Sequence, residues 1–95
     1  TSETTIATFD KTKYRTMKFQ VQITDTVANE YEMSEMNLVH DNTTATTTEF
    51  GIVYTGDSDL GGMDANISGN NLNVTFTSAN SNNKTIKLHF NAIKV

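Results

Sequence analysis

The sequence predicts an all-β fold, an antiparallel β-sandwich of about seven short strands, with a small β-barrel as the alternative. Three observations support this prediction. Apolar and polar residues alternate over several segments, turns rich in Asn, Asp and Gly separate those segments, and no segment has a convincing helical pattern. Thr and Asn are abundant and Pro is absent, which suits pleated strands joined by tight turns.

The N-terminal half contains the clearest strand pattern. Alternating apolar residues with polar neighbours predict a strand with one buried and one solvated face: Met17, Phe19, Val21 and Ile23. Residues 4–9 predict a shorter first strand, in which Ile6 is the main apolar residue.

Residues 31–40 and 50–54 predict a long hairpin that turns at residues 41–44. Its first arm has Tyr31 and Met33 on one face, whereas the later apolar residues take the other parity: Met36, Leu38 and His40. This change of parity near Ser34–Glu35 predicts a β-bulge, because an extra residue redirects every later side chain. A short helical turn is the alternative. The second arm is expected to place three residues on one face, opposite Val53: Phe50, Ile52 and Tyr54.

The C-terminal half predicts three more strands after a Gly- and Asp-rich loop at residues 55–62. The first two form a tight hairpin around residues 68–71, with these apolar sets: Met63, Ala65 and Ile67, then Leu72, Val74 and Phe76. The last strand has Ile86, Leu88 and Phe90 on one face and ends in Ile93 and Val95. Together the strands supply roughly twenty apolar side chains, enough for two facing sheets about 10 Å apart.

The length of 95 residues predicts a single all-β domain, 1–95. The chain starts at Thr1 without Met, which fits either a processed product or one domain of a longer protein. No apolar run reaches the roughly 18–20 residues that cross a bilayer, and no signal peptide is seen. We therefore expect a soluble protein without a membrane partner.

Charge and cysteine content exclude several classes of function. The formal net charge is −4, and the only local cluster of bases is Lys11, Lys13, Arg15 and Lys18. This argues against a nucleic-acid partner, whose binding needs clustered cations. Because the chain has no cysteine, it has no disulfide framework and no thiolate metal site.

Three aspartates in one Gly-containing stretch are the metal candidates, for calcium: Asp57, Asp59 and Asp64. Their spacing does not fit an EF-hand, and a solvated turn is the favoured interpretation. Neither His40 nor His89 has a sequence-linked partner, and both are expected at the surface or at an edge. Ser58 and Ser68 lack the G-x-S-x-G pattern of a nucleophile. We therefore expect no enzyme activity and no cofactor.

The aromatic residues bear on carbohydrate binding, because sugar rings stack on exposed aromatic faces. Five are expected mainly in the core: Phe19, Phe50, Tyr54, Phe76 and Phe90. Tyr14 and Tyr31 remain as candidate glycan contacts.

Several motifs, in this order and spacing, resemble a small β-domain in virion structural proteins of marine tailed phages, especially cyanophage-type myoviruses. The motifs are K-F-Q-V-Q-I-T-D (18–25), L-V-H-D (38–41), E-F-G-I-V-Y-T (49–55), L-G (60–61) and D-A-N-I-S-G-N-N-L (64–72). The resemblance covers about three quarters of the chain, from Lys18 onward. The chain departs from the pattern at Asn42, Phe50, Asn66 and Asn73, which are expected at turns and on the surface.

The resemblance implies a virion location and an assembly or adhesion module, with no catalytic or ligand residues to carry over. The expected function is a non-enzymatic structural or assembly module that acts through protein–protein contacts, in a tail, neck, fibre or capsid accessory part. Its partners would be other virion proteins or a second copy in a homo-oligomer. The alternative is a carbohydrate-binding or host-adhesion module.

Overall fold

The computed structural model describes all residues, Thr1–Val95, and contains seven strands and no helix. The strands are β1 (Glu3–Asp10), β2 (Tyr14–Asp25), β3 (Glu30–His40), β4 (Ala45–Tyr54), β5 (Gly61–Ser68), β6 (Asn71–Ser78) and β7 (Thr85–Lys94). They form a three-stranded sheet in the order β1-β6-β5 and a four-stranded sheet in the order β4-β3-β2-β7. All neighbours are antiparallel. The predicted seven-stranded β-sandwich is confirmed.

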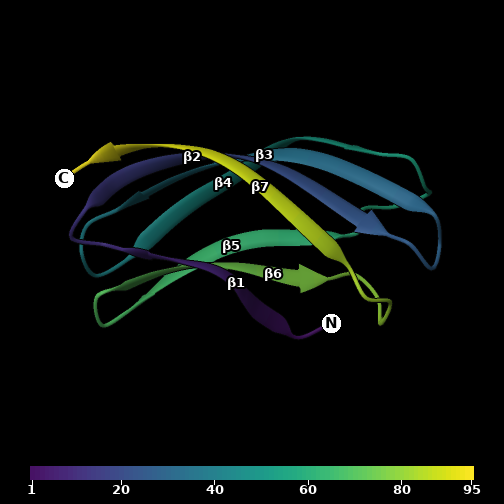
Figure 1. Ribbon diagram of the computed structural model, residues 1–95, viewed down its shortest axis with the longest axis horizontal. Helices are drawn as coiled ribbons and strands as arrows, with labels where there is room; N and C mark the ends of the chain where they lie inside the picture. The colour runs from purple at the N-terminus through teal and green to yellow at the C-terminus, as the bar shows by residue number, and fades with distance from the viewer.

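The two sheets face each other and their strands run along the longest of the 40 × 23 × 16 Å dimensions (Figure 1). The core between them contains eleven buried apolar residues: Met17, Phe19, Val21, Ile23, Met36, Leu38, Leu60, Met63, Leu72, Val74 and Phe76. The alternating residues of β2 all point into this core, as predicted. Burial of such side chains is the main stabilising contribution to the fold.

The two sides of the sandwich are held in different ways. Beside β4 and β5, side chains bridge the sheets: the Thr47 hydroxyl donates to Asp64 at 3.1 Å, and the Met63 N–H donates to Glu49 at 3.0 Å. Beside β1 and β7, the rings of Phe9 and Phe90 pack edge to face with centroids 5.0 Å apart. Neither side has a backbone ladder between the sheets, so the barrel alternative is wrong.

The predicted change of parity in β3 is wrong. Its pairing with β2 is continuous from Glu30 to Val39, and even-numbered residues point inward throughout. Tyr31 and Met33 are therefore exposed, whereas Glu32 and Ser34 are buried. Polar residues can occupy these inner positions because the Ser34 hydroxyl donates to Glu49 and one oxygen of Glu32 accepts from Leu60 N–H.

A β-bulge does occur at this level, but the extra residue lies in β4. Met33 pairs with Val53 and Glu35 pairs with Phe50, so two residues of β4 oppose one residue of β3. Gly51 has φ +64°, a left-handed conformation that glycine adopts without the penalty of a Cβ. The bulge places Phe50 and Val53 on the same outer face, which corrects the prediction that they lie on opposite faces.

The predicted β5–β6 hairpin is confirmed, with Ser68 paired to Asn71. Gly69 has φ +59°, as the first central residue of a type II′ turn requires. Among the aromatic residues expected in the core, only Phe19 and Phe76 are buried. The other three are partly exposed, so the prediction that they lie in the core is wrong: Phe50, Tyr54 and Phe90.

Candidate functional site

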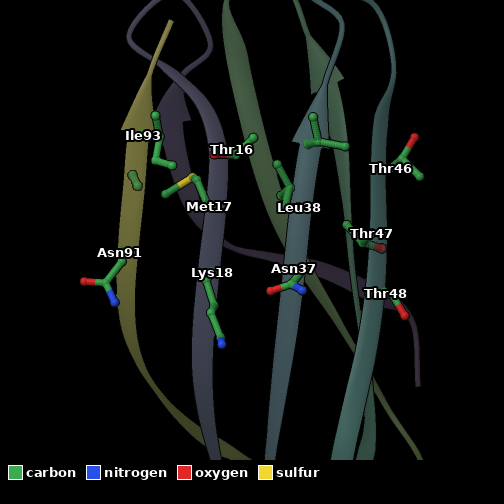
Figure 2. Close-up of a pocket in the computed structure, with 12 residues that line it drawn as sticks. Thr16, Met17, Lys18, Asn37, Leu38, Thr46, Thr47, Thr48, Asn91 and Ile93 are labelled. Carbon is green, nitrogen blue, oxygen red and sulfur yellow. The ribbon is translucent and has the colours of Figure 1, made fainter.

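The outer face of the four-stranded sheet contains a well-formed hollow. A groove of about 470 Å³ crosses this face near the start of β2 and the end of β7. The strand register places the outward side chains in rows across the sheet. One row is Asn91, Lys18, Asn37 and Thr48, and the next is Ile93, Thr16, Val39 and Thr46. The groove lies between these two rows (Figure 2).

One wall of the groove is polar throughout, and the other combines two aliphatic side chains with two threonines. Hydrogen bonds within the protein engage the adjacent Thr47 and Glu49, but none engages the side chains of Asn37, Asn91 or Thr48. Lys18 is the only charged residue that lines the groove, and its Nζ lies 3.8 Å from the exposed Glu35 carboxylate. These amide and hydroxyl groups are therefore available to a ligand.

Farther along β3 and β4 lies an apolar patch at the edge of the sheet. We call it the β4 patch, and its residues are 36–62% exposed: Tyr31, Met33, Phe50, Ile52, Val53 and Tyr54. Tyr31, Met33, Phe50 and Val53 share the outer face, and the bulge at Gly51 brings Phe50 and Val53 together there. β4 is an edge strand whose only hydrogen-bonded neighbour is β3, so the patch surrounds backbone groups that are free to pair.

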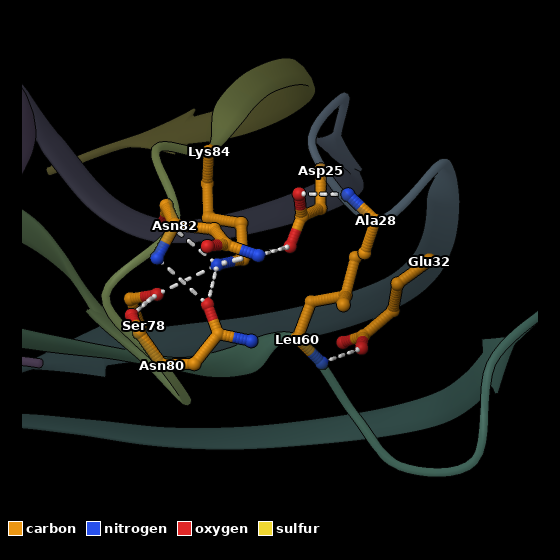
Figure 3. Close-up of polar contacts among 8 residues, drawn as sticks. All are labelled: Asp25, Ala28, Glu32, Leu60, Ser78, Asn80, Asn82 and Lys84. Atoms are coloured by element: carbon orange, nitrogen blue, oxygen red, sulfur yellow. Dashed lines mark hydrogen bonds and ion pairs between the residues drawn. The ribbon is translucent and has the colours of Figure 1, made fainter.

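A buried ion pair joins the end of β2 to the turn before β7 (Figure 3). The Asp25 and Lys84 side chains are 0% and 2% exposed, with 3.5 Å between Asp25 Oδ2 and Lys84 Nζ. Lys84 also donates to Ser78 Oγ at 3.0 Å, Asn80 Oδ1 at 2.7 Å and the Asn82 carbonyl at 2.8 Å. This oxygen cage satisfies the ammonium group, so the cluster is structural.

The Asp25 carboxylate accepts two further hydrogen bonds. Ala28 N–H donates to Oδ1 at 3.0 Å and the Asn82 amide donates to Oδ2 at 3.1 Å. The Ala28 hydrogen bond is the largest cause that holds the pKa of Asp25 below its usual 3.8, followed by Asn82 and then Lys84, against the effect of burial.

Glu32 has the opposite environment. Its Oε1 accepts a hydrogen bond from Leu60 N–H at 2.6 Å, but its buried Oε2 has no partner. Burial is the largest cause that raises the pKa of Glu32 above its usual 4.5, and the charges of Asp59 and Glu49 add to it. Its geometry nevertheless fits a structural role, because Oε1 ties β3 to the loop that precedes β5.

The structure separates the two histidines. His40 is buried, accepts a hydrogen bond at Nδ1 from Asn42 N–H, and contacts the Tyr14 carbonyl through Nε2. His89 lies exposed on the outer face of β7. The expectation of a surface position is therefore wrong for His40, whose ring joins the end of β3 to the start of β2.

The calcium candidates do not form a metal site. No group of three or more His, Asp or Glu side chains is arranged to hold a metal ion. Asp57 and Asp59 are exposed in the loop, while Asp64 accepts hydrogen bonds from Thr47 Oγ1 and Ala65 N–H. The geometry thus favours their turn and bridging roles.

The two candidate glycan contacts lie far apart. Tyr14 is the first residue of β2 and packs against Phe9. Tyr31 pairs with Thr24, which lies ten residues after Tyr14 on β2. At about 3.3 Å per residue, the two tyrosines are therefore roughly 33 Å apart along the strand direction. Its hydroxyl donates to Asn29. The two rings cannot form one sugar platform.

Sequence reasoning missed the groove, the β4 patch and the Asp25–Lys84 pair. The strand pattern did contain a signal for the groove, since Lys18 and Asn37 occupy solvated positions of neighbouring strands. It contained none for the ion pair, whose residues are 59 positions apart in the chain.

Comparison with protein-family models and with curated proteins gives no match. None of the structural elements is a helix with the length and apolar character needed to span a membrane.

Proposed function

We propose that the chain is a non-enzymatic structural module of a phage virion that acts through protein–protein contacts. The observation that carries this proposal is the β4 patch. It gathers four large apolar side chains on the outer face, with Ile52 and Tyr54 also exposed on the same edge strand, and exposed apolar surface of this kind is typical of interaction sites.

The chemistry of the patch suits a protein partner. Tyr, Phe and Met are enriched in protein interfaces, where charged residues are depleted. The only charged residue of β4 is Glu49, and its carboxylate is already occupied by Ser34 Oγ at 2.7 Å and Met63 N–H at 3.0 Å. The exposed half of β4 therefore carries no charge of its own, and the neighbouring Glu35 of β3, which pairs with Phe50, lies 3.8 Å from the ammonium group of Lys18.

The virion assignment is supported by the motif resemblance. One of its motifs, at residues 49–55, supplies all four β4 residues of the patch. Partners would be other virion proteins or a second copy of this chain. The same resemblance gives the virion as the location.

Location is tested on purified particles of the phage that encodes the chain. Mass spectrometry should detect the chain in washed particles, and antibody labelling in electron micrographs should mark one particle part. A chain that is present in infected cells but absent from particles would overturn the virion assignment.

The role of the patch is tested by affinity capture from disrupted, purified particles. The immobilised wild-type chain should retain an identified structural protein, and Val53→Asp should not, because docking would bury an unpaired charge. Asn66→Asp is the matched control, since it adds the same charge at an exposed residue of the opposite sheet, away from the patch. Equal capture by all three proteins would exclude the patch as the contact site.

A further inference from the structure

The groove on the outer face shares no residue with the β4 patch, and it lies on the side of the sheet that faces away from the core. Its two walls are rows of side chains two residues apart along the strands, which corresponds to about 6.6 Å. It crosses four strands, or roughly 14 Å at the usual spacing (Figure 2). These dimensions suit one extended chain lying across the sheet.

The polar wall matches a ligand rich in hydroxyl groups. The side-chain amides of Asn37 and Asn91 each have an NH₂ group that donates and a carbonyl oxygen that accepts hydrogen bonds, and the Thr48 hydroxyl can do either. None of these side chains is engaged within the protein. A sugar ring likewise carries hydroxyls that donate and accept. Val39 and Ile93 on the other wall, 46% and 70% exposed, provide aliphatic surface for the C–H groups of the ring.

Two other kinds of extended ligand fit less well. An added peptide strand pairs with a free sheet edge, whereas the groove crosses strands whose backbone groups are engaged in ladders with their neighbours. A polyanion needs clustered cations, but Lys18 is the only one in the groove and lies 3.8 Å from the Glu35 carboxylate.

We propose that this groove binds a neutral oligosaccharide chain, with Asn37 and Asn91 as its main polar contacts. This goes beyond the assembly role and places the glycan contacts elsewhere than at Tyr14 and Tyr31, the candidates from the sequence. Because no aromatic residue lines the groove, the ligand gains no stacking, and a dissociation constant of about 1 mM is expected.

The test is an NMR titration of the ¹⁵N-labelled chain with maltohexaose, cellohexaose and laminarihexaose, each to about 10 mM. At least one should shift backbone signals along the two rows of the groove. The double variant Asn37→Ala/Asn91→Ala should weaken that binding about tenfold or more, because it removes two hydrogen-bonding groups. Asn66→Ala, an exposed asparagine of the opposite sheet, is the control and should bind like the wild type.

Dispersed spectra for each variant show that it is folded. The absence of shifts with all three sugars, shifts confined to other surfaces, or binding that the double variant leaves unchanged would each overturn the proposal. Binding only to a sulfated hexasaccharide, lost with Lys18→Gln, would also overturn it and assign an anion site instead.

Discussion

Replacing Lys84 with Met tests whether the buried ion pair secures one end of the sandwich. Methionine fills a similar volume but donates no hydrogen bond. The substitution leaves the Asn82 carbonyl without the donor that now lies 2.8 Å away. It also removes the positive charge 3.5 Å from a fully buried carboxylate.

The expected loss is large for a domain of this size. Removing one member of a buried ion pair costs about 3–5 kcal/mol, whereas the total stability of a small domain is about 5–10 kcal/mol. At roughly 4–8 °C per kcal/mol, Lys84→Met should lower the Tm by about 12 °C or more. Urea and thermal unfolding followed by far-ultraviolet circular dichroism measure this, since the chain has no tryptophan.

Lys87→Met is the matched control. Lys87 lies three residues later, on β7, and is exposed, so its replacement should change stability by no more than about 0.5 kcal/mol. If Lys84→Met destabilises the chain no more than this control, the assigned role of the ion pair is wrong.

The effect of pH gives a second check on the same pair. Ala28, Asn82 and Lys84 hold the folded pKa of Asp25 below 3.8. Its stabilising contribution is therefore present above about pH 4 and lost as pH falls through the folded pKa. Protonation also removes the unpaired charge in Lys84→Met. The difference in Tm between this variant and the wild type should thus narrow in acid, and a constant difference would argue against a charge effect.

Three further predictions concern the core, the bulge and Glu32. Glu32→Gln should raise the Tm at pH 8, because the raised pKa of Glu32 means that the stability of the wild type falls as pH rises above about 4.5. The difference in Tm between the variant and the wild type should shrink toward pH 4.5. A difference that does not change with pH would contradict this prediction. Gly51→Ala should cost about 1–2 kcal/mol in urea unfolding because φ is +64°, whereas Gly62→Ala, which meets no atom within 4 Å, should be neutral. Val21→Asp should unfold the chain, as seen in circular dichroism spectra, because it buries an unpaired charge. Ile67→Asp should destabilise the chain less, because Ile67 is only half-buried. A native spectrum for Val21→Asp would refute the assigned core.

Strands with a single buried face were predictable from local pattern. In β2 and β6, apolar residues recur at every second position, and these residues are buried in the core. The β5–β6 turn was equally predictable because Gly69 and Asn70 suit a two-residue connection. These features depend on side-chain periodicity and turn conformation, both of which are local.

β3 shows where local pattern fails. Glu32 and Ser34 look like solvated residues, and Tyr31 and Met33 look like core residues, yet the structure places them the other way round. Hydrogen bonds to Leu60 and Glu49 make the polar burial possible, and those partners come from other elements. The sequence predicted a bulge in β3, whereas the extra residue at this level lies in β4.

The candidate surfaces depend still more on tertiary structure. Asn37 and Asn91 belong to strands far apart in the chain, and the groove exists only because β2 lies between those strands. The β4 patch depends on the bulge at Gly51, which turns Phe50 and Val53 to one face. Conversely, the folded chain disperses Tyr14 and Tyr31 and assembles no metal site from Asp57, Asp59 and Asp64.

The sequence by itself determined the fold class, the number of strands and where each lies along the chain, and most of the buried apolar residues. Hydrophobic periodicity and turn chemistry encode these features within a few neighbouring residues. Only the tertiary structure decided the strand order in each sheet, the strand that contains the bulge, the buried polar partners and the shape of the outer face. These features require residues distant in the chain to meet, because a hydrogen-bond partner or a groove wall exists only once separate strands are packed together.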